Sequence, residues 1–122
     1  MLNILVIDDN DFFRETLVHM LQKEGHKITS SNDAAKALAL LEVAQPDLII
    51  TDILMPNMDS MEFIVELSRQ SNNTPVIAMS GGRCSITSAF NLESAKLLGV
   101  KVTLSKPFTL MALRVAMAMA LT

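Results

Sequence analysis

Five polar side chains with complementary chemistry stand at or just after the ends of apolar segments of the sequence. Three carry carboxylates, one carries a hydroxyl and one carries an ammonium group. If those segments are strands of one parallel sheet, the five side chains meet at its carboxyl edge, where functional groups gather in such folds. In sequence order they are Asp8, Asp9, Asp52, Ser80 and Lys106.

The three carboxylates predict a site for metal-dependent phosphoryl transfer. Carboxylates held together repel one another and stay ionised only beside a compensating cation. Oxygen atoms are the ligands that Mg²⁺ prefers, and Mg²⁺ often binds through one or two carboxylates together with phosphate oxygens. A carboxylate can itself be the nucleophile and form an aspartyl phosphate. We expect Asp52 to be that nucleophile, because it stands alone at the end of its segment.

The hydroxyl and the ammonium group complete this chemistry. Lys106 can neutralise a phosphoryl oxygen and Ser80 can donate a hydrogen bond to another, and phosphoryl transfer requires mainly positioning and charge stabilisation. The alternative is that the first two aspartates only cap the helix that follows. Because Asn10 or Asp11 can provide that cap, two further acids are surplus to it.

Short apolar runs precede these polar residues and are typical of strands buried on both faces of a parallel sheet. The segments between these runs show helical periodicity, so strand and helix alternate five times along the chain. Such an alternation places helices on both faces of a parallel sheet. The expected strands lie at 4–7, 28–30, 48–50, 76–79 and 100–104. The first expected helix has an apolar stripe over 13–21 and ends at Gly25, and the second is capped by Asn32 or Asp33 and closed before Pro46. The third has its apolar positions over 61–67 and ends in the polar turn 71–73, the fourth runs over 85–98, and the last is capped by Thr109.

The composition predicts one domain, residues 1–122, with ample material for a core, since half of the residues are hydrophobic. The formal net charge is −3, and no run of basic residues indicates nucleic-acid binding. No apolar stretch reaches the ~18 residues of a membrane span, and the N-terminus lacks the pattern of a signal peptide. Cys84 is the only cysteine, which excludes an internal disulfide. We expect a cytoplasmic protein with no direct contact to nucleic acid or membranes.

In these features the whole chain resembles the receiver domains of bacterial two-component response regulators, of the single-domain type. The resemblance implies a doubly wound (βα)5, flavodoxin-like α/β sandwich with a five-stranded parallel sheet of order 2-1-3-4-5. The matching segments are 4–11, 47–52, 55–56, 58–59, 76–80 and 105–108.

The resemblance also implies the roles of the site residues. Asp52 would take a phosphoryl group from a sensor histidine kinase or a phosphotransfer protein, and Ser80 and Lys106 would sense and stabilise that group. The Lys106–Pro107 peptide bond is expected to be cis. Phosphorylation would shift the chain between two states and repack a protein-interaction face, so we expect a signalling phosphoacceptor rather than an enzyme. Mg²⁺ would be held by Asp8, Asp9, Asp52 and the backbone carbonyl of Leu54.

The sequence departs from the family at the fifth strand and after Ser80. Thr103 stands where an aromatic residue usually swings inward, so the switch is altered at this position. The interval from Ser80 to Lys106 is longer than usual and begins with two glycines. Leu54 and Gly82 offer no group that could orient water, so we expect a long-lived phosphorylated form.

The last expected helix, over 110–121, contains one charged residue, Arg114. A helix that is apolar all round is either buried or meets a partner. We expect a homodimer or target interface on the face made by the fourth helix, the fifth strand and the fifth helix. The alternative is that the chain has been cut from a longer protein.

Two other functions remain open for this site. A degenerate receiver would act only as a binding module, but such domains generally lose an acid or the lysine, and this chain keeps both. A magnesium-dependent hydrolase that forms an aspartyl phosphate needs a second carboxylate two residues after the nucleophile, where this chain has Leu54.

Overall fold

The computed structural model describes residues 1–43, 45–52, 66, 74–80 and 100–121. Apart from residue 66, the helices expected over 61–67 and 85–98 fall outside these residues. The elements are β1 (Asn3–Ile7), α1 (Asp11–Lys23), β2 (Lys27–Ser31), α2 (Ala34–Val43), β3 (Leu48–Asp52), β4 (Val76–Ser80), β5 (Val102–Ser105) and α5 (Leu110–Ala120).

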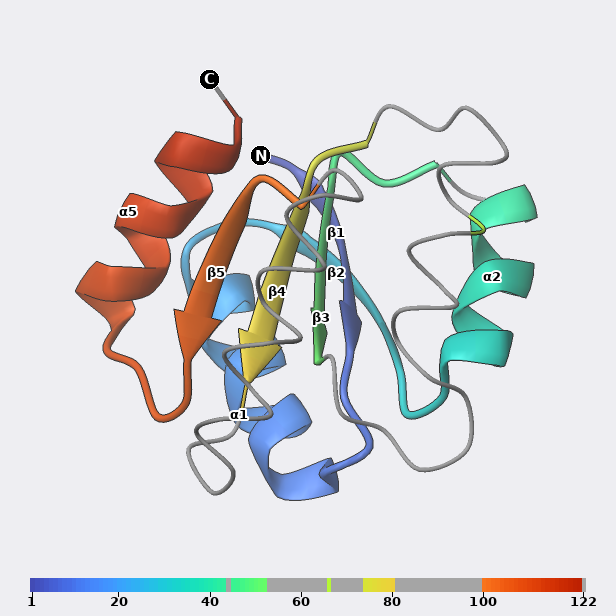
Figure 1. The fold of residues 1–122 in the computed structure, drawn as a ribbon, viewed down its shortest axis with the longest axis horizontal. Coiled ribbons are helices and arrows are strands. Elements are labelled where there is room, and N and C mark those ends of the chain that lie inside the picture. The colour runs from blue at the N-terminus through green and yellow to red at the C-terminus, as the bar shows by residue number, and fades with distance from the viewer. Residues whose placement is uncertain (44, 53–65, 67–73, 81–99, 122) are drawn as a thin grey trace.

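The strands form one parallel sheet in the order β2-β1-β3-β4-β5 (Figure 1), which confirms the predicted order. The strand order changes direction at β1, which has β2 on one side and β3 on the other. In the pairing of β1 with β3, Ile7 lies opposite Thr51. The residues that follow this pair, Asp8 and Asp52, therefore emerge side by side at the switch point, where ligands bind in open parallel sheets.

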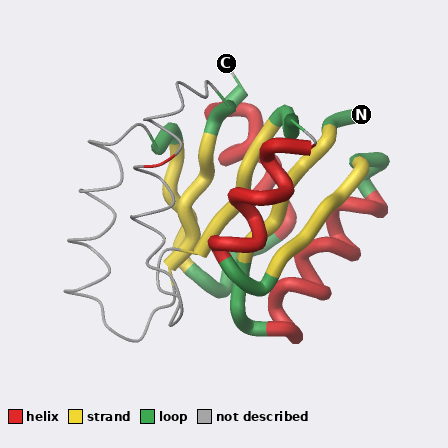
Figure 2. Tube along the Cα trace, turned by 90° about the vertical axis from the view of Figure 1, so that its right-hand side faces the viewer, coloured by secondary structure: helices red, strands yellow, loops and turns green. Residues whose placement is uncertain are grey.

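Alternate residues of the central strands point to opposite faces of the sheet. One set, which includes Ile4, Ile50 and Ile77, forms a buried cluster with Leu17 of α1 and Leu113 of α5. α1 and α5 therefore cover the same face. α2 lies on the other side of the sheet from α5 (Figure 1) and in front of the strands in Figure 2.

Local signals define the helix ends as the sequence predicts. The side chain of Asn10 caps α1 by accepting a hydrogen bond from the Phe13 N–H, and Thr109 caps α5. Of the two candidates for α2, Asp33 provides the cap, because its Oδ1 accepts from the N–H groups of residues 35 and 36 at 2.7 and 3.1 Å. After α1, Gly25 adopts a φ of 89°, a conformation that residues with a Cβ rarely adopt.

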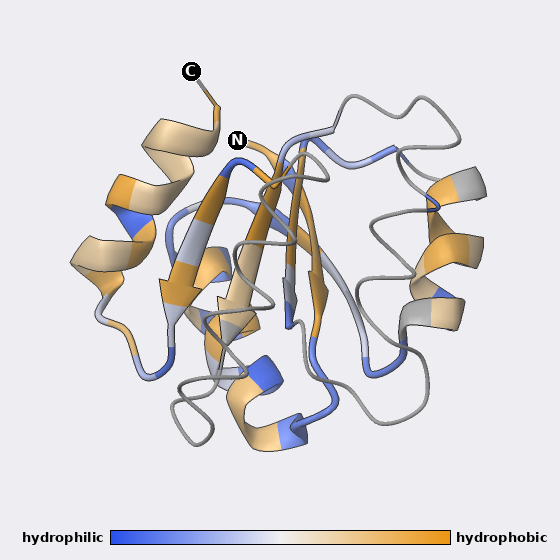
Figure 3. Cartoon of the chain, viewed as in Figure 1, coloured by the Kyte–Doolittle hydropathy of each residue, from blue (hydrophilic) through white to orange (hydrophobic). Residues whose placement is uncertain are grey.

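The described part of the chain includes no helix long and apolar enough to cross a membrane. α5 carries mainly hydrophobic residues along its length (Figure 3). Its inner side is buried against β4 and β5 through Leu113 and Met117. Its outer side exposes Met111, Val115 and Met119, whose exposed fractions are 63%, 51% and 60%.

Candidate functional site

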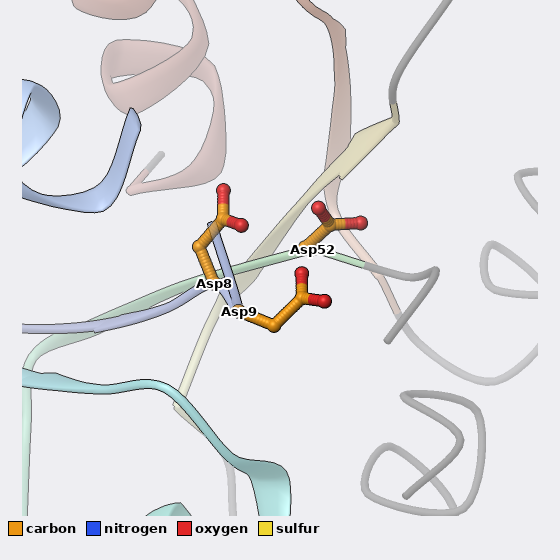
Figure 4. A group of neighbouring side chains, drawn as sticks. All are labelled: Asp8, Asp9 and Asp52. Atoms are coloured by element: carbon orange, nitrogen blue, oxygen red, sulfur yellow. The ribbon is translucent and has the colours of Figure 1, made fainter. Parts of the chain in front are cut away.

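Three aspartates meet at the carboxyl edge of the sheet, as the sequence predicts. Asp8 and Asp9 follow β1 and Asp52 ends β3 (Figure 4). One carboxylate oxygen from each residue lies within 4.8 Å of the other two. Asp8 is completely buried, Asp52 is 6% exposed and Asp9 is exposed. The site therefore has two carboxylates buried inside the protein and a third exposed to solvent.

Lys106 places its ammonium group between the two buried carboxylates. Its Nζ lies 2.6 Å from Asp8 Oδ2 and 2.7 Å from Asp52 Oδ2, and its side chain is 14% exposed. Such charge-assisted hydrogen bonds are shorter and stronger than neutral ones. The lysine thus neutralises part of a charge that would otherwise destabilise the folded chain.

The electrostatics of Asp8 and Lys106 reflect their burial. Burial raises the pKa of the Asp8 carboxyl and outweighs the opposing hydrogen bonds from Lys106 and from the Asn10 N–H. Burial alone would lower the pKa of Lys106, but its hydrogen bonds to Asp52 and Asp8 outweigh that effect and raise it. The ammonium group stays protonated because both of its partners favour its charge.

The loop that carries Asp8 and Asp9 is held by hydrogen bonds from α1 and its cap. The Asn10 N–H donates to Asp8 Oδ1 at 2.9 Å, and Arg14 Nη1 donates to the Asp8 carbonyl at 2.8 Å. Arg14 also pairs with Asp11 at 2.7 Å. Sequence reasoning missed this role of Arg14. Its spacing of three from Asp11 indicates only the ion pair with that residue, not the hydrogen bond to Asp8.

Two aromatic residues border the lysine and were also not predicted as site residues. The ring centroid of Phe13 lies 4.3 Å from Lys106 Nζ. The rings of Phe13 and Phe108 meet edge to face, with centroids 5.6 Å apart. The Lys106–Pro107 peptide bond between the lysine and Phe108 is cis, the conformation that the sequence led us to expect.

The remaining predicted site residues are only partly described. Ser80 ends β4 opposite Ser105 of β5, but its side chain lies outside the described residues, as do Leu54 and the loop after Ser80. Thr103 is half-buried in β5 and pairs with Ala78. The structure therefore places Ser80 and Thr103 on neighbouring strands, β4 and β5.

The donor set fits a hard divalent cation. Asp8, Asp9 and Asp52 offer only oxygen ligands, and three carboxylate charges against one Lys106 charge leave −2 at the site. A small cation that prefers oxygen ligands, such as Mg²⁺, matches both the charge and the chemistry.

Comparisons with known proteins agree on the type of domain. The sequence matches the family described as response regulator receiver domain over residues 4–118. It is 28% identical to the alkaline phosphatase synthesis transcriptional regulatory protein PhoP of Bacillus subtilis, covering 87% of this chain and 42% of that protein. It is 31% identical to the sensor histidine kinase RcsC of Salmonella typhi, covering 94% of this chain and 12% of that protein. This chain thus spans less than half of the length of both relatives.

A solved structure extends the likeness to the whole fold. The chemotaxis protein CheY4 of Vibrio cholerae superposes with a TM-score of 0.86 at 29% identity, covering 98% of each chain.

Proposed function

This chain belongs to the response regulator receiver domain family, and from that premise we propose that Asp52 is the residue that accepts the phosphoryl group. The family places the chain in two-component signalling as a phosphoacceptor domain. The observation that carries the choice of Asp52 is its carboxylate, which ends β3 beside Asp8 and lies 2.7 Å from Lys106 Nζ. Its nucleophilic oxygen would thus lie next to a fixed positive charge.

The proposed reaction transfers a phosphoryl group between two side chains. A carboxylate oxygen of Asp52 attacks the phosphorus of a phosphohistidine, so an O–P bond forms while the P–N bond breaks. The histidine nitrogen keeps the electron pair of the broken bond and takes up a proton. Lys106 stabilises the negative charge on the transferred group, because its ammonium is already directed at the attacking carboxylate.

The proposed metal ligands are Asp8, Asp9 and Asp52, together with the backbone carbonyl of Leu54. The fit of charge and donor type supports the first three. A bound Mg²⁺ would neutralise negative charge on the phosphoryl oxygens. Arg14 and Asn10 would keep the ligand loop in place through their hydrogen bonds to Asp8.

We propose a sensor histidine kinase or a phosphotransfer protein as the donor, since the chain is similar to both a transcriptional regulator and a sensor kinase. In this proposal the chain catalyses only its own phosphorylation and dephosphorylation. A degenerate receiver is disfavoured because the three acids and the lysine are together in one site.

For the output face we propose a second copy of the chain, docked on β5 and α5. Met111, Val115 and Met119 recur every four residues on the exposed side of α5. Together with residues of β5 they line a groove of about 600 Å³. The same face on both copies would make a two-fold symmetric contact. The part of this face expected from residues 85–98 lies outside the described residues.

One labelling experiment tests the acceptor. Wild type and Asp52→Asn are incubated with Mg²⁺ and acetyl phosphate, and the phosphorylated fraction is measured by intact-mass spectrometry. We expect labelling of the wild type and none of Asp52→Asn. Asp47→Asn, which alters the carboxylate just before β3 at the opposite end of the strand, is the matched control and should label normally. Equal labelling of wild type and Asp52→Asn would exclude Asp52.

A further inference from the structure

The ammonium group of Lys106 has a third neighbour besides its two carboxylates. Its Nζ lies 4.3 Å from the centroid of the Phe13 ring, while it donates to Asp8 Oδ2 at 2.6 Å and to Asp52 Oδ2 at 2.7 Å. A cation over an aromatic face is attracted by the negative charge of that face, and more strongly where water is excluded. Lys106 is mostly buried, so this contact belongs to the stronger class.

Phe13 is itself held in place from three directions. Its N–H donates to the side chain of Asn10, the cap of α1, at 3.0 Å. Its ring packs edge to face with the ring of Phe108, two residues beyond Lys106, and it packs against the buried core between the sheet and α1. α1 therefore contacts the segment after β5 on both sides of its cis peptide bond. Because the Phe13 ring is held in a defined position, it can restrict the position of the Lys106 ammonium group that it contacts.

Lysine needs such a constraint to act at a defined point. Its ammonium is a compact charge on a flexible four-carbon stem, and holding it still costs side-chain entropy. The carboxylates of Asp8 and Asp52 attract Nζ toward the carboxyl edge of the sheet. Asp52, however, is the proposed phosphoacceptor, and its charge and shape would change on modification. The ring of Phe13, in contrast, is not itself altered by a change at Asp52.

We propose that Phe13 is a positioning residue, whose ring holds the ammonium group of Lys106 against the carboxylates of Asp8 and Asp52. This inference rests on the proposed function, in which Lys106 stabilises the transferred phosphoryl group. The chemical feature at work is the negative ring face, in addition to the apolar volume that Phe13 contributes to the core.

Phe12 supplies a matched control on the same helix. It is 82% exposed, whereas Phe13 is half-buried against the core. A change of Phe12 to Leu removes one aromatic ring from α1 without altering the surroundings of Lys106. A change of Phe13 to Leu keeps an apolar side chain in the core but removes the ring face.

The first measurement reads the position of Lys106 directly in the resting protein. Protons above an aromatic ring move upfield in NMR spectra, so the ε-methylene protons of Lys106 should be shifted upfield in wild type and in Phe12→Leu. In Phe13→Leu that shift should disappear, while urea unfolding confirms that the variant is folded. Ordinary ε-methylene shifts in folded wild-type protein would overturn the proposal, whatever the outcome of any phosphorylation assay.

The second measurement separates the ring face from its shape. A trifluorinated phenylalanine at position 13 keeps the shape of the ring but weakens its negative face. We expect both this variant and Phe13→Leu to be phosphorylated about threefold to tenfold more slowly by acetyl phosphate, which matches the usual size of such contacts. Rates equal to wild type in both variants would mean that Phe13 only packs the core.

These outcomes stay distinct from a failure of the proposed function. If wild type and Asp52→Asn label equally, the acceptor assignment fails, and the NMR shift still decides whether Phe13 positions Lys106. If wild type labels and Asp52→Asn does not, the rates of the Phe13 variants decide whether that position matters for transfer.

Discussion

Two regions depart from the rule that apolar side chains lie inside a protein and charged ones outside. One is the carboxyl edge of the sheet with Asp8, Asp52 and Lys106, which we call the rim, and the other is the outer side of α5. At the rim, charged groups lie inside the protein: Asp8 is completely buried and Asp52 nearly so. On α5, large apolar side chains lie outside, with Met111 and Val115 more than half exposed. Buried charge and exposed apolar surface are the informative exceptions in a folded chain. Buried charge costs stability unless a partner compensates it, whereas a group of exposed apolar side chains marks a surface for association.

The two regions differ in what their unusual residues contribute. At the rim, Lys106 compensates the buried charge, since it contacts both buried carboxylates. On the outer side of α5, Met111, Val115 and Met119 are half or more exposed, and this surface is the one we propose for a second copy of the chain. Changes at the rim should therefore alter folding stability, and changes on α5 should alter association.

The largest effect is expected from removing the central cation. Lys106→Met leaves Asp8 and Asp52 buried without their partner, and breaking such a pair costs about 3–5 kcal/mol. Urea unfolding at neutral pH without divalent ions should show this loss. Lys101→Met, at an exposed lysine just before β5, should stay within about 0.5 kcal/mol of wild type. Equal stability of the two variants would mean that the rim does not depend on Lys106.

A somewhat smaller effect is expected from the metal. A cation that binds only the folded rim stabilises it by mass action, by about 2.7 kcal/mol at a hundred times the dissociation constant. Saturating Mg²⁺ should raise the thermal midpoint of wild type, and a chelator should reverse the rise. Asp9→Asn should weaken this response, whereas Glu15→Gln, at an exposed position of α1, should preserve it. A response unchanged by Asp9→Asn would remove Asp9 from the ligand set.

Substitution on the outer side of α5 should change association more than stability. Val115→Glu places a charge in the proposed dimer face but leaves the core intact, so the free energy of unfolding should change by about 0.5 kcal/mol or less. Light scattering of the phosphorylated or beryllofluoride-treated protein should show a dimer for wild type and a monomer for the variant. Val43→Glu, the same change at an exposed valine of α2, should remain dimeric. A monomeric wild type would remove the proposed partner of α5.

The smallest effect is expected from a charge pair at the surface between the two helices. Arg114 of α5 contacts Glu24 at the end of α1, and these hydrogen bonds hold the pKa of Glu24 below its ordinary value of 4.5. A carboxyl with a lowered folded-state pKa adds stability above that ordinary value and loses it as the pH falls through the folded value. Glu24→Gln should thus be slightly less stable than wild type at neutral pH, and the gap should close in acid. If the difference in stability between Glu24→Gln and wild type did not change with pH, or if Glu15→Gln showed the same pH dependence, the Glu24–Arg114 pair would be excluded as its cause.

Sequence reasoning predicted the elements and the acidic residues because the signals for both are local. Apolar runs, helical stripes and caps such as Asn10 and Thr109 act within a few residues. The structure confirms them for the elements that it describes, the five strands with α1, α2 and α5. The convergence of Asp8, Asp9 and Asp52 needed one further step, the parallel order of the strands. That step was available because strand–helix alternation allows few topologies.

The structure alone revealed the supporting contacts. Arg14 was not predicted to hold the Asp8 carbonyl, since a helical arginine gives no sign of the partner it will reach. Phe13 was predicted only as part of an apolar stripe, and its contact with Lys106 joins residues from opposite ends of the chain. The N–H of Leu2 donates to His26 at 3.2 Å, a pairing that no local pattern indicates.

The alternation of strands and helices, the acidic residues of the site and the likeness to receiver domains follow from the amino-acid sequence alone, because periodicity and short motifs are properties of neighbouring residues. Other contacts become visible only in the folded chain: Lys106 donates a hydrogen bond to Asp8 across 98 positions of the chain, and Arg114 donates to Glu24 across 90. Those partners depend on strand register and helix packing, which are set by the whole core at once. The sequence therefore predicts the chemistry of the site, whereas the contacts that hold Lys106 in place depend on the fold.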